Sequence, residues 1–165
     1  MKIIIGFLIT VVMFIGCSSK ATDMDVKPKL VVEKSLANLA LNDQNGNAHK
    51  LKATTKKVIF AFSKDIGHTC NNFFATKDAK YLDNNNAIFI ADVSGAPSLI
   101  RSMFILPGLK DFKHTVLILD DKELSSGYKK NQDVEKIVVA EVNDGIIKEI
   151  KSLNTVDELA KEIEK

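Results

Sequence analysis

The sequence carries one thiol and two imidazoles whose types and spacing could support chemistry. Cys70 closes the segment Gly67-His68-Thr69-Cys70, and His114 lies further along the chain. An imidazole near a thiol can accept its proton or stabilise the thiolate, and the same two groups can share a soft metal ion. We therefore predict Cys70, His114 and His68 as candidate catalytic residues. Cys70 and His114 are also candidate ligands of Cu(I), as an alternative to a site without any cofactor.

The position of Cys70 decides whether its sulfur reacts. Thr69 suits a helix N-cap, so the sequence predicts a helix over 70–81 with Cys70 in its first turn. There the positive end of the helix dipole lowers a thiol pKa. The small and polar Gly67-His68-Thr69 favours a partly accessible sulfur. The alternative for Cys70 is a small buried apolar side chain without chemistry, and for His114 an exposed residue at a strand edge.

The first 17 residues form an export signal that ends in a cysteine. Lys2 precedes an apolar stretch of about 13 residues, which is too short for the roughly 20 that span a bilayer. Phe14-Ile15-Gly16-Cys17 resembles the lipobox of bacterial lipoproteins, and this resemblance implies cleavage after residue 16 and a lipid on Cys17. An ordinary signal peptide or an uncleaved anchor is the alternative.

We accordingly predict a lipoprotein signal peptide over 1–16, a lipid-anchored tether over 17–35 and one soluble domain over 36–165. The membrane of the cell envelope is then the first partner. Ser18 resembles the outer-membrane sorting pattern, which implies an outer-membrane protein facing the periplasm if the bacterium has two membranes. A net charge of +2, with Arg101 as the only arginine, argues against nucleic acid as a partner.

The domain alternates strands and helices. Apolar runs predict strands over 57–62, 87–91 and 115–119, and turn-rich segments predict β-hairpins over 38–52 and 137–150. Helices are predicted over 70–81, 97–106 and 155–164, and the last begins with a capping box of Thr155 and Glu158. Four phenylalanines are assigned to the core, namely Phe73, Phe74, Phe104 and Phe112. This order predicts an α/β domain with a mixed central sheet flanked by helices.

The elements and the motifs within them resemble the thioredoxin-like superfamily, above all its exported members and the alkyl hydroperoxide reductase and thiol-specific antioxidant group. Leu39-x-Leu41-x-Asp43-Gln44-x-Gly46 is similar to their N-terminal β-hairpin, and Gly67-His68-Thr69-Cys70 stands where they carry C-x-x-C. The resemblance implies a thioredoxin-like fold over 36–165. It also implies thiol or peroxide chemistry at Cys70, assisted by His114 or His68 and resolved by an external thiol or a disulfide partner protein.

Two departures from the superfamily limit that chemistry. Gly67 occupies the position of the first cysteine, which excludes exchange by a vicinal pair, and His114 replaces the cis-proline. Because Cys17 is committed to lipid, Cys70 is the single free thiol, so an enzyme here would be a single-cysteine thiol oxidoreductase or peroxidase. The segment from His114 is similar to the ligand-histidine segment of Sco-type copper chaperones, which implies the copper alternative. A non-catalytic envelope binding protein on the same scaffold is the third possibility.

Overall fold

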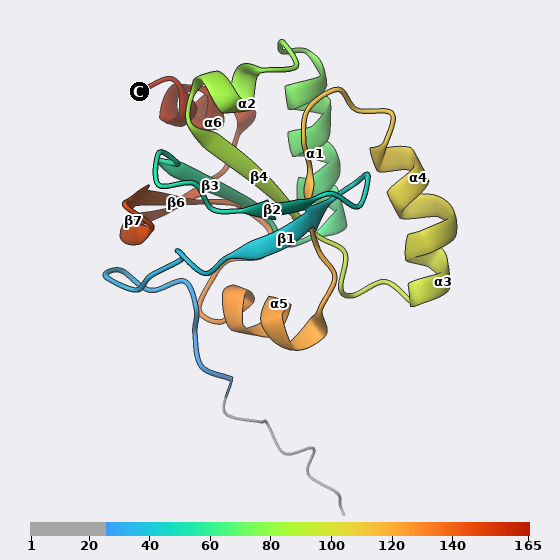
Figure 1. The fold of residues 1–165 in the computed structure, drawn as a ribbon, viewed down its shortest axis with the longest axis horizontal. Coiled ribbons are helices and arrows are strands. Elements are labelled where there is room, and N and C mark those ends of the chain that lie inside the picture. The colour runs from blue at the N-terminus through green and yellow to red at the C-terminus, as the bar shows by residue number, and fades with distance from the viewer. Residues whose placement is uncertain (1–25) are drawn as a thin grey trace, which may run out of the picture.

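A computed structural model describes residues 26–165, which form one seven-stranded sheet with helices on both faces (Figure 1). The strands are β1 (Ala40–Asp43), β2 (Ala48–Lys50), β3 (Lys57–Ala61), β4 (Ala87–Asp92), β5 (Leu117–Leu119), β6 (Ile137–Asn143) and β7 (Ile146–Leu153). The helices are α1 (Lys64–Ala75), α2 (Tyr81–Asn84), α3 (Ser98–Ile100), η1 (Arg101–Ile105), α4 (Leu106–Leu109), α5 (Lys122–Lys129) and α6 (Val156–Ile163).

The sheet has the order β2-β1-β5-β4-β3-β6-β7 and is parallel only at its centre. β3 pairs with β4 in parallel, from Lys57 opposite Ala87 to Ala61 opposite Ala91, and β4 pairs with β5 in the same way. The two hairpins add the outer strands antiparallel. This confirms the predicted mixed sheet, the predicted N-terminal hairpin and the parallel, adjacent central strands. Every residue of β3 is buried, as expected for a strand covered on both faces.

Two apolar cores lie on opposite faces of the sheet. On one face α1 and α6 pack over the sheet through residues such as Phe74 and Leu159, and on the other face α5 does so through Tyr128. In Figure 1 these helices lie above and below the strands. The capping box predicted at Thr155 and Glu158 is present and starts α6, so this prediction is confirmed.

The first helix begins six residues earlier than predicted. Its N-cap is Ser63, whose side chain accepts a hydrogen bond from the Ile66 amide at 3.4 Å, and Asp65 lies in its first turn. The predicted start at Thr69 and the predicted span of 70–81 are therefore wrong. Ser63 takes the cap because it follows β3 almost directly and offers an oxygen to the free amides of the first turn.

The segment after β4 is helical, as predicted, but its apolar residues are not all in the core. Residues 98–109 form continuous helical turns through α3, η1 and α4. Phe104 is 65% exposed, so its assignment to the core is wrong, whereas Phe74 is buried and Phe73 and Phe112 pack partly buried against the core.

The predicted signal peptide and Cys17 lie outside the described residues. The last part of the predicted tether does not hang free, because Leu30 is buried and Lys29 donates a backbone hydrogen bond to Gly127 at 2.8 Å. The Glu33 amide likewise donates to the Ile147 carbonyl at 2.8 Å. The packed domain thus starts before the predicted boundary at residue 36. Between residues 26 and 165 no helix has both the length and the apolar character needed to cross a membrane.

Candidate functional site

Cys70 lies in the middle of α1 rather than in its first turn. The helix places Ile66, Cys70 and Phe74 on one side, and this side faces the core. The Cys70 side chain is 0% exposed, so the expected partial access is wrong for the folded chain. Burial raises the pKa of the Cys70 thiol to about 12, because the apolar surroundings disfavour the thiolate. At this depth in the helix the dipole no longer offsets that cost.

The residues before Cys70 do not surround the sulfur. His68 is exposed, and two residues along a helix amount to a rotation of about 200°. His68 therefore points away from the face that holds Cys70. Gly67 also lies on the helix, where a Cβ atom would meet no atom within 4 Å. The structure does not bring His68 and Cys70 together.

His114 is buried beside α1, at the turn that leads into β5. Its ring lies among three phenylalanine rings, with centroid distances of 5.4 Å to Phe74, 5.2 Å to Phe112 and 6.4 Å to Phe89. His114 Nε2 lies 3.0 Å from Asn71 Oδ1. The alternative of an exposed strand-edge histidine is wrong. Among residues 26–165 no peptide bond is cis, in keeping with a histidine where the superfamily carries its cis-proline.

The surroundings of His114 keep its ring neutral. Burial lowers the pKa of His114 to about 4, since the apolar rings disfavour the imidazolium. Because Asn71 presents an oxygen, Nε2 carries the proton and donates it. Nδ1 is then left as a buried acceptor without a hydrogen-bond partner. A neutral ring with an unpaired nitrogen contributes no positive charge that would stabilise a thiolate.

Sequence reasoning missed two polar residues that hold His114 in place. Asn71 follows Cys70 on α1 and is buried, and it ties this helix to the turn before β5. Gln44 Nε2 donates to the His114 carbonyl at 2.8 Å, and Gln44 Oε1 accepts from the Val116 amide at 2.9 Å. Asn71 has no sequence signal beyond its place on the core side of an amphipathic helix. Gln44 stands in the hairpin motif, where its type alone does not reveal its partner.

The donor set does not fit a tight Cu(I) site. Cu(I) prefers a thiolate, and the thiol of Cys70 is held neutral in an apolar core. His68 lies on the other side of α1, and the part of the chain from residue 26 onward contains no cluster of three or more His, Cys, Asp or Glu residues suited to a metal. The arrangement of Cys70, His114 and His68 therefore does not support copper chemistry.

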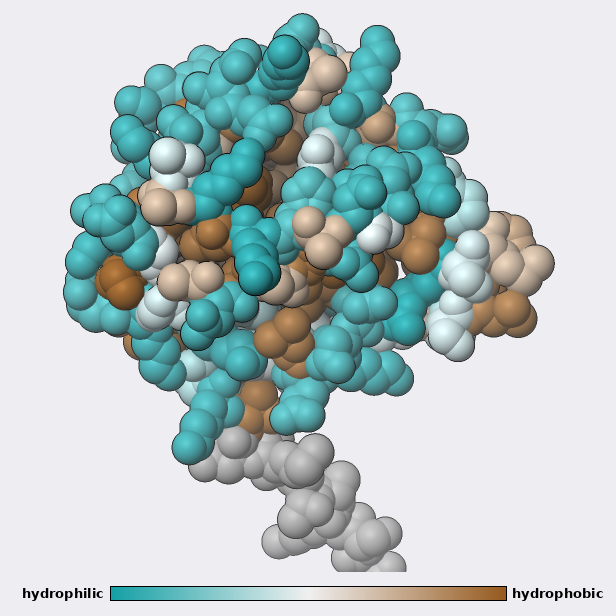
Figure 2. All heavy atoms as spheres, in the orientation of Figure 1, coloured by the Kyte–Doolittle hydropathy of each residue, from teal (hydrophilic) through white to brown (hydrophobic). Residues whose placement is uncertain are grey.

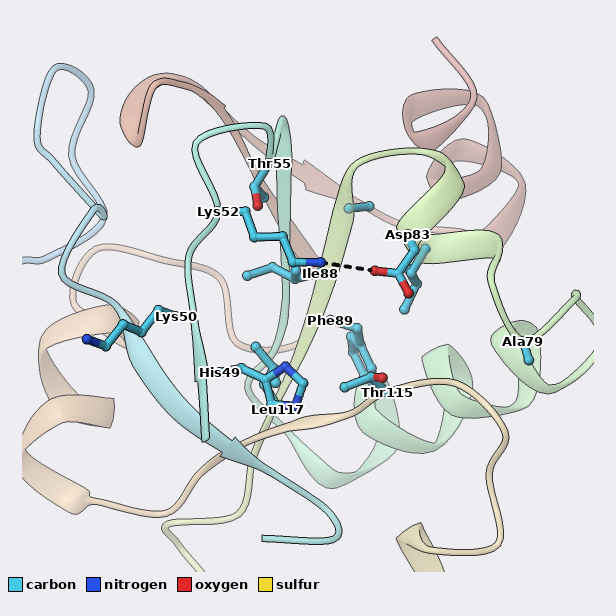
Figure 3. A pocket seen from close by; sticks show the side chains of 12 residues that line it. His49, Lys50, Lys52, Thr55, Ala79, Asp83, Ile88, Phe89, Thr115 and Leu117 are labelled. Carbon is cyan, nitrogen blue, oxygen red and sulfur yellow. Dashed lines mark ion pairs between the residues drawn. The ribbon is translucent and has the colours of Figure 1, made fainter. Parts of the chain in front are cut away.

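A hollow of about 160 Å³ lies away from the thiol, between β2, α2 and the sheet (Figure 3). Lys52 and Asp83 approach one another across it, with Nζ and Oδ1 3.8 Å apart. His49 reaches the hollow from β2 and pairs with Asp43 at 2.9 Å. Burial alone would raise the pKa of Asp43, but hydrogen bonds from Asn47 and His49 outweigh it and lower that pKa to about 2. These contacts fasten the hairpin, and Cys70 and His114 do not line this hollow.

Comparison with known proteins places the fold but not a family. No protein-family model and no curated protein matches the sequence. Solved structures match at low identity. One is the exposed lipoprotein thioredoxin of Streptococcus pneumoniae, at 13% identity and a TM-score of 0.53, covering 78% of this chain and 98% of that one.

Two further solved structures share the arrangement. The peroxidoxin BcpB of Mycobacterium tuberculosis is 16% identical, with a TM-score of 0.51 over 80% of this chain and 92% of its own. The thioredoxin domain of a thiol-disulfide oxidoreductase from Bacteroides vulgatus is 13% identical, with a TM-score of 0.50 over 82% of this chain and 96% of its own. The sheet order, the two helical layers and these matches agree with the resemblance found in the sequence, and the chain therefore has a thioredoxin-like fold.

Proposed function

We propose that this chain is a lipid-anchored protein of the bacterial cell envelope whose thioredoxin-like domain serves as a non-catalytic binding module. The observation that carries this proposal is the complete burial of Cys70 on the core side of α1. A nucleophilic thiol must meet its substrate as a thiolate, and this sulfur is neither exposed nor ionised at neutral pH.

The positions around Cys70 support the same proposal. The start of α1, where a thiolate would gain most from the helix dipole, carries Ser63 as its cap. Gly67 leaves no second thiol for exchange, and the ring of His114 is neutral and enclosed by phenylalanines. Each group that the chemistry of the fold would need is absent, buried or uncharged at these positions.

Thiol redox chemistry through Cys70 is the second candidate, and the fold favours it. A thiol-disulfide oxidoreductase and a peroxidoxin share this arrangement over about four-fifths of the chain. In this function α1 would have to open locally before the sulfur could attack a peroxide or a disulfide. An external thiol or a partner protein would then have to reduce the product, because Cys70 is the one free thiol of the described chain.

Catalytic assays separate the two candidates. We expect the reduced mature chain to consume hydrogen peroxide, and to reduce insulin disulfides, no faster than the Cys70→Ala variant, because the buried neutral thiol cannot reach either substrate. Peroxide loss and insulin turbidity measure the two activities. Catalysis by the native chain that disappears in Cys70→Ala would establish the redox function and remove the non-catalytic one.

The envelope location rests on the sequence at Cys17 and is supported by the exposed lipoprotein thioredoxin among the similar structures. We expect mass spectrometry of the mature protein to show a diacylglycerol on Cys17, and the protein to fractionate with membranes. Cys17→Ser should lose the lipid, and the protein should be released or mislocalised. Cys70→Ser is the matched control, since it also removes one sulfur but should stay membrane-bound. An unmodified Cys17 in the wild-type protein would contradict the anchor.

A further inference from the structure

The helical segment 98–109 exposes an apolar face that the fold does not cover. Among residues 26–165 five large apolar side chains are exposed, and four of them lie on this segment: Leu99 at 64%, Ile100 at 42%, Met103 at 59% and Phe104 at 65%. Their spacing of i, i+1, i+4 and i+5 puts them on one side of the helix. Figure 2 shows apolar surface at the right-hand edge of the molecule, where Figure 1 places α3 and α4.

The opposite side of the same segment is apolar as well. Ile105, Leu106 and Leu109 pack against the core, so the segment is held to the domain without help from its outward face. The segment also carries Ser98, Arg101 and Ser102, but a cluster of large apolar side chains exposed in this way normally marks an interaction surface. Here one side packs against the core, and the apolar side chains on the other side are 42–65% exposed. We therefore expect the outward face to contact an apolar environment other than the core of the domain.

The two charges on this segment and at its end are positive, with Asp111 directly after Lys110, and the Arg101 guanidinium also donates to the Asp120 carbonyl at 3.0 Å. No acidic residue occurs between Asp92 and Asp111, and Arg101 and Lys110 supply positive charge within that stretch. An apolar helix face flanked by cations is the pattern of helices that lie in the interface of a membrane, with cations at the lipid phosphates. A protein partner would meet the apolar side chains equally well, but a bilayer is the apolar phase that the proposed anchor on Cys17 already brings close to the domain.

The proposed anchor holds the domain close to a bilayer. The nine residues from Cys17 to Asp25 can span at most about 30 Å, which is close to the diameter of a domain of this size. The first described residues pack beside α5, through the hydrogen bond from Lys29 to Gly127, and α3 lies level with α5 in Figure 1. A tether of this length lets the domain turn residues 98–109 toward the surface that carries the lipid.

We propose that the outward face of residues 98–109 enters the headgroup region of the bilayer to which Cys17 is attached, with Met103 and Phe104 against the acyl chains and Arg101 and Lys110 near the phosphates. This inference rests on the proposed lipid anchor. Lipid and helix together would fix the orientation of the domain on the membrane. A lipid at the end of a tether leaves the orientation of the domain free, whereas a second contact with the bilayer restricts it.

The chain contains no tryptophan, so Phe104→Trp introduces a single fluorescent reporter at the most exposed of the four positions. The mature lipidated variant is reconstituted in vesicles of phosphatidylethanolamine and phosphatidylglycerol that contain lipids brominated near the top of the acyl chain. We expect a blue-shifted emission and quenching of about twofold, as for a side chain buried roughly 5–10 Å below the headgroups. Ser152→Trp, at an exposed position on β7, is the matched control and should stay unquenched.

A second substitution checks that the apolar face itself causes the quenching. Leu99→Gln in the Phe104→Trp chain should weaken the quenching, while Cys17 keeps its lipid by mass spectrometry. Unquenched emission from Phe104→Trp in a lipidated chain overturns the docking and leaves the anchor standing. A blue shift without quenching also overturns it, because it means that a second copy or another protein covers the face. Quenching in a chain without lipid supports the docking and contradicts only the anchor.

Discussion

At pH 7, Cys70 in the folded chain should react with iodoacetamide about a thousandfold more slowly than in the unfolded chain. The reacting species is the thiolate, and burial raises the pKa of Cys70 from its ordinary value of 9.0 to about 12. At pH 7, an increase of one in the pKa lowers the fraction of thiolate tenfold. Lack of access to the sulfur, which is 0% exposed, adds to this factor. Mass spectrometry of quenched time points, with and without denaturant, measures both rates.

The chain offers a control in the same helix. Thr69 is exposed and directly precedes Cys70. The double variant Thr69→Cys/Cys70→Ala therefore moves the thiol by one residue from the core to the surface. We expect this thiol to react in the folded chain nearly as fast as in denaturant. Rapid reaction of native Cys70, at a rate close to that of the control, would mean that α1 opens readily, and the redox candidate would then lead.

Acid should destabilise the fold through His114. In the folded chain burial lowers the pKa of His114 to about 4, against an ordinary value of 6.5 for the unfolded chain. Between these two values the unfolded chain binds a proton that the folded chain does not, so the stability present above pH 6.5 is lost as the pH falls toward 4. We expect the free energy of unfolding to drop by about 2 kcal/mol between pH 7 and pH 5. Urea denaturation at the two pH values measures it.

The variant His114→Gln separates this effect from other titrations. Glutamine keeps a polar side chain opposite Asn71 but cannot take up a proton, so its loss of stability between pH 7 and pH 5 should be below about 0.5 kcal/mol. The carboxylates of Asp43 and Glu162 have pKa values lowered to about 2, so the stability that they contribute is lost only as the pH falls below about 4.5. An equal loss in wild type and variant would show that His114 is not the group responsible.

Local sequence patterns were enough to predict the framework of the domain. Each central strand is a run of consecutive apolar, β-prone residues. Such a short run predicts a strand that is buried on both faces of the sheet. The helix α6 was predictable to within a residue because its cap and its apolar period are local features. The count of thiols also needs no structure, and it alone excludes disulfide exchange by a vicinal pair.

The chemistry of the candidate site depended on contacts between distant segments. Thr69 and Ser63 are both residue types that cap helices, and in the folded chain α1 begins at Ser63, just after the end of β3. With that start, Ile66, Cys70 and Phe74 share one face, and the face that meets the core decides that the sulfur is buried. A start at Thr69 would have left the same cysteine at an open helix end. The sequence period places residues on a common face but does not say which other element covers it.

For His114 and the segment 98–109, too, the residue types were known from the sequence but their burial was decided by tertiary contacts. The type of residue 114 allowed a base, a metal ligand or an exposed strand-edge residue. Its burial was decided by Phe74, Asn71 and Gln44, which are remote from it in the sequence, together with the nearby Phe112. Phe104 reads as a core residue because its side chain is large and apolar, yet the opposite face of its helix is the one that packs. Secondary-structure propensity and helix capping depend on residues that are close in the sequence. Burial depends on the assembled tertiary structure, and the pKa of a thiol or an imidazole depends on burial.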